Sequence, residues 1–149
     1  MPKIQIFMSQ RHRHCDEIIA DAENLISSKN WAVGAVKFQL FCDELNLHLA
    51  MEEEILFPAV DDKMGGSCGP TQVMMGEHEK MRGLLQMLHE AIEAHDSNAF
   101  LGNSETLLML IQQHNMKEEH MLYPMADNLL GSEADEIVNQ MTAMDKRHA

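Results

Sequence analysis

The chain has 149 residues, a length typical of one domain with its own hydrophobic core, and we take residues 1–149 as a single domain. Its formal net charge of −13 argues against binding to nucleic acid or to anionic membrane surfaces, because both attract basic proteins. No apolar run approaches the roughly 20 residues of a membrane span or forms a signal peptide at the start of the chain, so we predict a cytoplasmic protein.

Four long segments have the apolar periodicity of amphipathic helices, whereas β-branched residues are sparse and no alternating strand pattern is seen. The segments cover residues 9–26, 31–62, 71–95 and 104–130, and the connections between them fall at 27–30, 65–70 and 96–103. Short connections favour antiparallel neighbours. We therefore predict an all-α, antiparallel up-down-up-down four-helix bundle over about residues 9–130, followed by a C-terminal extension over 131–149.

Several residues predict where helices end or bend. Gly131 should end the fourth helix, and Ser132 should cap a short C-terminal helix over residues 133–144. Pro58 and Pro124 lie late in the second and fourth segments. Each should kink or end its helix about one turn earlier, because proline lacks the backbone N–H that a helix needs.

A duplicated His-x-x-x-Glu is the most informative motif. His48-Leu-Ala-Met-Glu52 recurs as His114-Asn-Met-Lys-Glu118, inside the longer matching segments HLAMEEEILFPAVDD and HNMKEEHMLYPMADN. Four-residue spacing on a helix stacks both side chains on one face. A neutral imidazole and a carboxylate in that arrangement suit a divalent metal, and two such helices facing each other suit a pair of metals.

Ionisable residues also interrupt the apolar stripes of the predicted helices. On the third helix His78 lies between Met74 and Met81, and the two His-x-x-x-Glu pairs lie within the stripes of the second and fourth. An unpartnered carboxylate in such a position would cost several kcal/mol. Metal coordination would compensate for that cost directly.

The first helix offers two candidate histidines. His12 precedes His78 by the same 66 residues that separate His48 from His114, so the repeat favours His12. His14 lies one turn before Ile18, on the side of the helix that carries further apolar residues. The apolar stripe alone does not decide between them.

The predicted ligands are one histidine from each of four helices and one glutamate from each of two. Two roughly octahedral metals need about twelve coordination positions, and four histidines with two bridging glutamates supply about eight. A shared oxo or hydroxo group would fill about two more, which leaves about two for water or a diatomic gas. Mixed imidazole and carboxylate ligation suits two iron ions, with manganese or zinc as alternatives.

The ordered pattern resembles the haemerythrin-like HHE cation-binding family, whose motif is His, His-x-x-x-Glu, Glu-His and His-x-x-x-Glu on four successive helices. In this sequence the resemblance covers about residues 11–130 and reads His14, His48 and Glu52, Glu77 and His78, and His114 and Glu118. It implies a four-helix bundle with a non-haem di-iron centre that the two glutamates bridge. We accordingly predict as metal ligands His14, His48, Glu52, His78, His114 and Glu118.

Within that family, the chain departs from the oxygen carriers, which have a further histidine where this sequence has Arg82. The segment GPTQVMMGEHEKMRGLL from Gly69 to Leu85 is similar to di-iron proteins that repair iron–sulfur clusters, and in those proteins the first histidine corresponds to His14. The resemblance implies a stress-related protein that binds or senses O₂ or NO. The alternative is an enzyme or repair factor that acts on NO or peroxide, or donates iron to an iron–sulfur protein partner.

Other residues receive less specific predictions. Cys15, Cys42 and Cys68 form no metal-binding or disulfide pattern and read as reduced thiols. Glu53 and Glu119 follow the predicted ligands and are expected to be solvated or to support them from outside. Phe57 and Tyr123 occupy equivalent positions of the repeat and are expected to pack in the core, as aromatic side chains commonly do.

Overall fold

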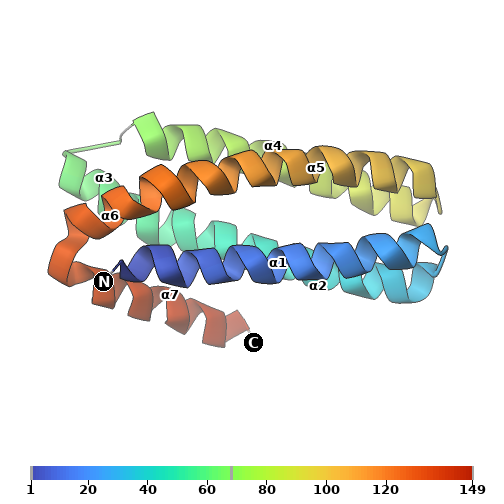
Figure 1. Ribbon diagram of the computed structural model, residues 1–149, viewed down its shortest axis with the longest axis horizontal. Helices are drawn as coiled ribbons and strands as arrows, with labels where there is room; N and C mark the ends of the chain where they lie inside the picture. The colour runs from blue at the N-terminus through green and yellow to red at the C-terminus, as the bar shows by residue number, and fades with distance from the viewer. Residues whose placement is uncertain (1, 68, 149) are drawn as a thin grey trace.

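The computed structural model describes residues 2–67 and 69–148, and helices make up nearly all of that part of the chain (Figure 1). The elements in chain order are α1 (Lys3–Ser27), α2 (Trp31–Met51), the π-helical turn η1 (Glu52–Leu56), α3 (Phe57–Met64), α4 (Gly69–Glu93), α5 (Ser97–Lys117), the π-helical turn η2 (Glu118–Leu122), α6 (Tyr123–Leu130), the 3₁₀ turn η3 (Gly131–Glu133) and α7 (Ala134–His148).

The four long helices form the predicted bundle. Helices α1 and α2 pack against each other along their length, as do α4 and α5, and the two pairs meet through α1 with α5 and α2 with α4. Successive helices run in opposite directions (Figure 1). The shorter α3 and α6 extend α2 and α5 at the end of the bundle that also holds the N-terminus. The all-α, four-helix fold is therefore confirmed.

The first helix begins earlier than the sequence predicts. Helix α1 starts at Lys3, and its first turns bury Ile4 and Met8 completely. The backbone N–H groups of Ile4 and Gln5 donate to the two carboxylate oxygens of Asp127 in α6, over 2.9 and 3.1 Å. A carboxylate at a helix N-terminus satisfies N–H groups that have no partner within the helix. These hydrogen bonds hold the start of α1 against α6.

The predicted connection over residues 96–103 is wrong. Helix α5 begins at Ser97, and the side chain of Asp96 accepts a 3.0 Å hydrogen bond from the backbone N–H of Ala99. Aspartate is a favoured N-cap residue for this reason. Phe100 then lies fully buried on the first turn of α5. Most of the segment is therefore helical, and its hydrophobic residues belong to the core.

A π-helical turn precedes each of the two matching prolines. In η1 the backbone N–H of Phe57 donates to the carbonyl of Glu52, five residues earlier, and in η2 Tyr123 donates to Glu118 in the same way. The proline ring would clash with the carbonyl four residues before it in a regular α-helix. The wider turn accommodates Pro58 and its counterpart, so the chain continues as α3 and α6. π-Helical turns of this kind occur frequently at functional sites.

The core consists of two apolar clusters along the bundle. One lies towards the α1–α2 and α4–α5 connections and includes Phe38, Phe41, Leu88 and Phe100. The other lies towards α3, α6 and α7 and includes Ile4, Leu56, Leu122 and Met141. Ionisable side chains fill the layer between them, as described below.

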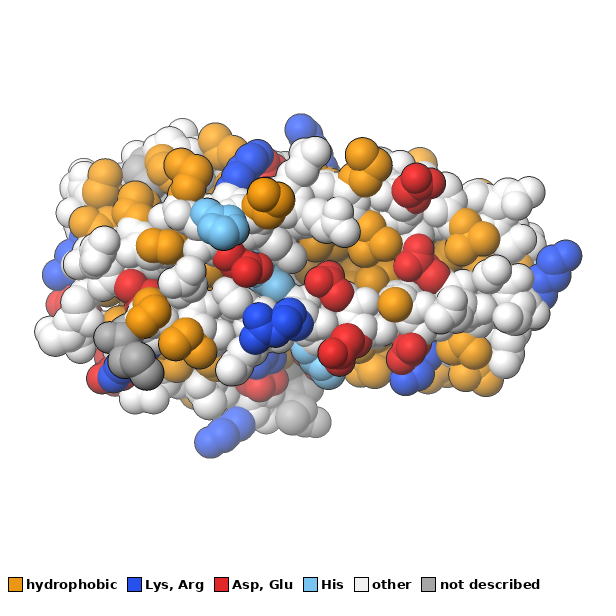
Figure 2. Space-filling view, in the orientation of Figure 1, with side chains coloured by type: hydrophobic (Ala, Val, Ile, Leu, Met, Phe, Trp, Pro, Cys, Tyr) orange, Lys and Arg blue, Asp and Glu red, His pale blue; other side chains and the backbone are white. Residues whose placement is uncertain are grey.

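The C-terminal helix packs along the side of the bundle, over α1 and α2, from the end that holds the N-terminus (Figure 1). Helix α7 contacts α1, α2 and α6, and an ion pair joins Lys3 to Asp135. Charged side chains are spread over the face of the molecule seen in Figure 2, with hydrophobic ones between them. Within the described ranges, none of the helices combines the length and hydrophobicity that a membrane span requires.

Replacement of Met141 by Ala tests whether α7 is part of the core. Met141 is fully buried, whereas Met109 on α5 is 57% exposed. We expect Met141→Ala to lower the free energy of unfolding by about 2–5 kcal/mol, because truncating a buried methionine leaves a cavity. The matched surface variant Met109→Ala should change it by less than about 0.5 kcal/mol. Chemical denaturation measures both, and equal effects would show that α7 does not pack as described.

Candidate metal centre

Six ionisable side chains meet in the layer between the two apolar clusters. Each is at most 5% exposed, which is unusual for histidine and glutamate in a helical bundle. They come from the four long helices and from the first residue of each π-helical turn. The six residues are His12, His48, Glu52, His78, His114 and Glu118.

Their ligand atoms form two adjoining groups. Glu52, His78, His114 and Glu118 offer one set of atoms that all lie within 4.8 Å of one another, which we call site A. His12 and His48 form a second set with Glu118, which we call site B. Glu118 belongs to both sets, so its carboxylate lies where it could bridge two metals. Glu52, which the sequence analysis also predicts as a bridge, belongs to site A alone.

Buried atoms without hydrogen-bond partners support the fit of a metal to these residues. Among the described residues, Glu52 Oε1, His78 Nε2, His114 Nε2 and Glu118 Oε2 are buried and make no hydrogen bond. Yet His78 Nε2 lies 3.0 Å from Glu52 Oε1, and His114 Nε2 lies 3.2 Å from Glu118 Oε1. Leaving such groups unsatisfied costs free energy. Cations bound between them would satisfy all four, so the residues fit a metal centre.

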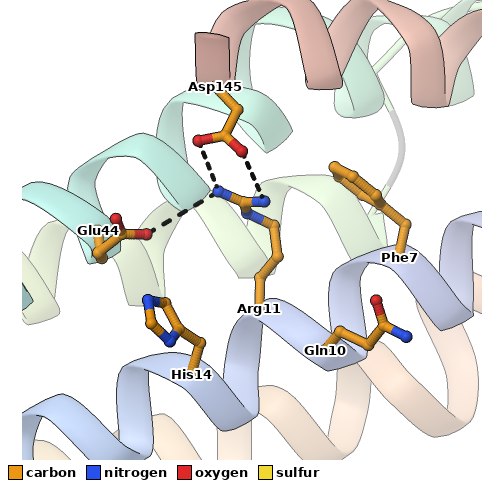
Figure 3. A pocket seen from close by; sticks show the side chains of 6 residues that line it. All are labelled: Phe7, Gln10, Arg11, His14, Glu44 and Asp145. Carbon is orange, nitrogen blue, oxygen red and sulfur yellow. Dashed lines mark hydrogen bonds and ion pairs between the residues drawn. The ribbon is translucent and has the colours of Figure 1, made fainter. Parts of the chain in front are cut away.

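The histidine that α1 contributes is His12, not His14. His12 Nε2 lies 3.0 Å from His48 Nε2 and 3.2 Å from Glu118 Oε1. His14 is exposed on the outer side of α1, where it lines a surface pocket with Arg11, Glu44 and Asp145 (Figure 3). The structure thus contradicts the placement of His14 at the centre, and the offset of the repeat gives the correct position.

The reason lies in the full length of α1. Ile4 and Met8 are buried at four-residue intervals before His12, and Cys15 and Ile19 continue the same buried face. His14 is two residues from His12 and so lies on another face of the helix. A predicted helix starting at residue 9 omits Ile4 and Met8, and with them the part of the apolar stripe that agrees with the repeat in favouring His12.

Three carboxylates hold the histidines from outside the centre. In each case the histidine Nδ1 lies 2.7 Å from a glutamate oxygen, which leaves Nε2 facing the centre. Such contacts fix the ring and raise its basicity as a ligand. The pairs are His12 with Glu119, His78 with Glu53 and His114 with Glu77. By contrast, His48 Nδ1 is buried and has no hydrogen-bond partner among the described residues.

Basic residues stabilise two of these outer carboxylates. Arg82 donates to Glu53 over 2.8 Å, and Lys117 donates to Glu77 over 2.6 Å. Although partial burial raises the pKa of Glu53, hydrogen bonds from Arg82 and His78 lower it overall. Arg82 therefore supports the candidate ligand His78 through Glu53.

Electrostatics in the centre favour a neutral His48 and a single carboxylate charge when no cation is bound. Burial lowers the pKa of His48 to about 4, so this ring is neutral at pH 7. Burial and the charge of Glu118 raise the pKa of Glu52 well above its usual value. Hydrogen bonds from Glu52 and from the histidines hold the pKa of Glu118 low in spite of its burial. Metal binding would release the proton that the two glutamates share.

Tyr123 has a polar role that the sequence analysis did not predict. The side chain is fully buried, and its hydroxyl lies 2.7 Å from Glu52 Oε2 and 2.9 Å from Glu118 Oε1, either of which can accept its proton. On an α-helix a residue five positions after Glu118 would lie on a different face. The π-helical turn brings it back to the centre. The position of the Tyr123 hydroxyl at the centre could have been predicted only if the π-helical turn had been known.

A small enclosed cavity of about 10 Å³ adjoins the centre, a volume close to that of one water-sized probe. Its walls are mostly apolar, and three histidines reach it from the centre. The lining residues are His12, Cys15, Leu45, His48, Leu49, Met81, Ile111, His114 and Asn115. Burial raises the pKa of the Cys15 thiol to about 12, so this group is neutral and does not offer a thiolate.

Two of the three cysteines, Cys15 and Cys42, are free thiols in the structure, as the sequence predicts for them. Cys68 lies outside the described residues. Burial also raises the pKa of Cys42 to about 12, so it too is protonated at pH 7. Neither thiol has the low pKa of a reactive cysteine.

Comparison with known protein families agrees with the arrangement of these residues. The family model described as the Hemerythrin HHE cation binding domain matches residues 4–126, which include the whole candidate centre. The chain therefore belongs to this family, and the predicted family resemblance is confirmed. No curated protein and no solved structure matches the chain.

Single replacements of the two α1 histidines test the composition of the centre. We expect His12→Ala to lose the metal of site B, because only His48 and Glu118 of that set would remain. His14→Ala should retain the wild-type metal content, since its side chain lies on the outer face of α1. Metal analysis after anaerobic loading and desalting measures both. If His14→Ala lost metal and His12→Ala did not, the assignment made from the structure would be wrong.

Replacement of Glu77 by Gln tests the outer carboxylates. The change leaves a weaker partner for His114 Nδ1 and should lower metal affinity by about 10- to 100-fold. Glu54→Gln, at an exposed glutamate beside Glu53, is the matched control for loss of one negative charge. Competition with a chelator measures the affinities. Equal affinities for the two variants would rule out a specific role for Glu77.

Proposed function

We propose that this HHE-domain protein holds two iron ions in sites A and B and binds or senses a diatomic molecule, O₂ or NO, in the adjoining cavity. The observation that carries the proposal is the position of that cavity. It is small, mostly apolar and bordered by histidines of both sites. Its volume of about 10 Å³, close to that of one water-sized probe, suits a very small ligand rather than a large substrate.

The donor set supports iron as the metal. The candidate ligands are imidazole nitrogens and carboxylate oxygens, and the neutral, buried Cys15 supplies no thiolate. Such mixed ligation suits iron, with manganese and zinc as the alternatives to be compared. An oxo or hydroxo bridge would fit between sites that share Glu118. Bound iron would supply the open coordination positions and the change of oxidation state that O₂ and NO binding use.

The surrounding residues prepare the site for a small apolar ligand. Leu45, Leu49 and Ile111 keep the cavity mostly apolar, which favours O₂ or NO over water. Glu53, Glu77 and their basic partners hold two histidine rings in fixed orientations, so that Nε2 faces the centre. The chain thereby lines the ligand position with apolar side chains and fixes the candidate ligand atoms beside it.

An enzyme or repair factor is the second candidate function. Arg82 binds Glu53 and lies outside the set of candidate ligands, which leaves site A with fewer protein ligands than an oxygen carrier has. An open position of that kind supports chemistry on NO or peroxide, both small enough for the cavity, or release of iron to an iron–sulfur protein. Turnover distinguishes this function from reversible binding.

Anaerobic loading with ferrous iron followed by separate exposure to O₂, NO and peroxide tests the proposal. We expect two iron ions per chain, with Mössbauer spectra of two inequivalent sites because sites A and B differ in ligands. An optical O₂ or NO adduct that disappears under vacuum would support reversible binding. Multiple turnovers of NO or peroxide would instead support the enzyme. A chain that bound one iron or none would contradict the dinuclear centre.

Replacement of Ile111 by Phe tests the cavity. Ile111 lines the cavity, and a larger side chain there should fill the void and weaken O₂ or NO binding at least tenfold while both metals remain bound. Met109→Phe adds bulk at an exposed position of the same helix and is the control. Adduct formation is titrated optically in both variants. Wild-type affinity in a correctly folded, fully loaded Ile111→Phe variant would show that the ligand binds elsewhere.

A further inference from the structure

The geometry points to Tyr123 as a fourth protein ligand, which binds the metal of site B through its phenolic oxygen. This inference rests on the proposed metal centre and specifies its coordination. It assigns a chemical role to a residue that the family motif, as read from the sequence, does not include.

The first observation is the position of the hydroxyl. Tyr123 Oη lies 3.2 Å from His12 Nε2, 3.4 Å from His48 Nε2 and 2.9 Å from Glu118 Oε1. These three atoms are the ligand atoms of site B. The hydroxyl therefore faces the same point in space as the three ligands already assigned to that site.

The second observation is the spacing of these atoms. Metal–ligand bonds of about 2.1 Å place neighbouring ligand atoms about 3.0 Å apart in octahedral and about 3.4 Å apart in tetrahedral geometry. The distances from Tyr123 Oη to the three site B atoms, 2.9–3.4 Å, are close to this range, and Oη also lies 2.7 Å from Glu52 Oε2 of site A. The distances from His12 Nε2 to His48 Nε2, 3.0 Å, and to Glu118 Oε1, 3.2 Å, lie in the range. A cation could contact all four atoms without a large rearrangement.

The third observation is the difference between the two sites. Site A has four candidate ligand residues, whereas site B has three. In the repeat, Tyr123 corresponds to Phe57, which lies beside His78 of site A with ring centroids 5.7 Å apart. The repeat thus places a hydroxyl at site B, which has fewer candidate ligands, and none at site A, which has more. Tyr123 would bring site B to the same number.

Ligation has a defined proton balance. The Tyr123 O–H bond breaks, an Oη–metal bond forms and the proton leaves to solvent, while the oxidation state of the metal does not change. Phenolate oxygen is an established ligand of ferric iron in proteins. The hydrogen bonds from Oη to Glu52 and Glu118 would be replaced by contacts of all three groups with the metals.

The position of Tyr123 also determines where an external ligand can bind. Tyr123 belongs to the apolar cluster near α3 and α6, whereas the cavity is bordered by residues of the opposite cluster, such as Leu45, Leu49 and Ile111. Ligation by Tyr123 would occupy the coordination position of site B that faces α3 and α6. O₂ or NO would then approach the centre from the cavity side.

The chain contains a single tyrosine, so a spectroscopic tyrosinate signal can come only from Tyr123. We expect the ferric, iron-loaded protein to show a visible phenolate-to-iron charge-transfer band and resonance-enhanced tyrosinate vibrations. Tyr123→Phe should lose both signals. Phenylalanine is the residue at the equivalent position of the repeat, so this variant should keep the fold. A second measurement uses zinc, whose binding should produce an ultraviolet difference spectrum of ionised tyrosine in the wild type but not in Tyr123→Phe.

Phe57→Leu is the matched control, because it alters the equivalent aromatic residue beside site A and should retain the tyrosinate signals. Metal analysis and circular dichroism accompany each variant. A wild-type protein with two bound ferric ions and no tyrosinate signal would overturn the ligand assignment while leaving the proposed function intact. A wild-type protein that failed to bind two metals would instead overturn the proposed function itself.

Discussion

Burial of ionisable groups in one layer of the bundle is the constraint on which the rest of this structure depends. Four histidines and two glutamates lie between two apolar clusters, almost completely shielded from water. A buried carboxylate without a partner costs free energy, and the surrounding residues supply partners that offset this cost. The outer glutamates orient the rings, Arg82 and Lys117 stabilise those glutamates at the surface, and a cation between the inner atoms would satisfy the remainder.

Sequence reasoning found those parts of the centre that follow regular α-helical spacing. His48 and Glu52 are one turn apart on one helix, and the repeat of that pair located the second helix. The same reasoning failed where the backbone departs from the expected length or pitch. His14 was preferred to His12 on the family resemblance, and a helix predicted from residue 9 lacks the buried turns that begin at Lys3 and favour His12. Tyr123 was expected only to pack in the core, because a π-helical turn, which proline spacing alone does not define, brings it to the centre.

The two halves of the repeat share a backbone but differ in the surroundings of their histidines. Glu77 supports His114, and the residue at the corresponding position of the first half is Arg11, which pairs with Glu44 and Asp145 instead. His48 consequently has no hydrogen-bond partner at Nδ1 among the described residues. The two halves of the repeat therefore give candidate sites A and B unequal surroundings.

The layered core also affects how the bundle opens. Helices usually fray from their ends, and the middle of a core exchanges its amide hydrogens most slowly. In this protein the apolar clusters lie on either side, and the least favourable layer without a cation lies between them. In the metal-free chain, buried polar atoms without hydrogen-bond partners thus lie at mid-helix, at and near the π-helical turns. Metal binding would satisfy these groups and hold the four helices together at their centre. Metal content would therefore affect local opening at the centre more than the stability of either end of the bundle.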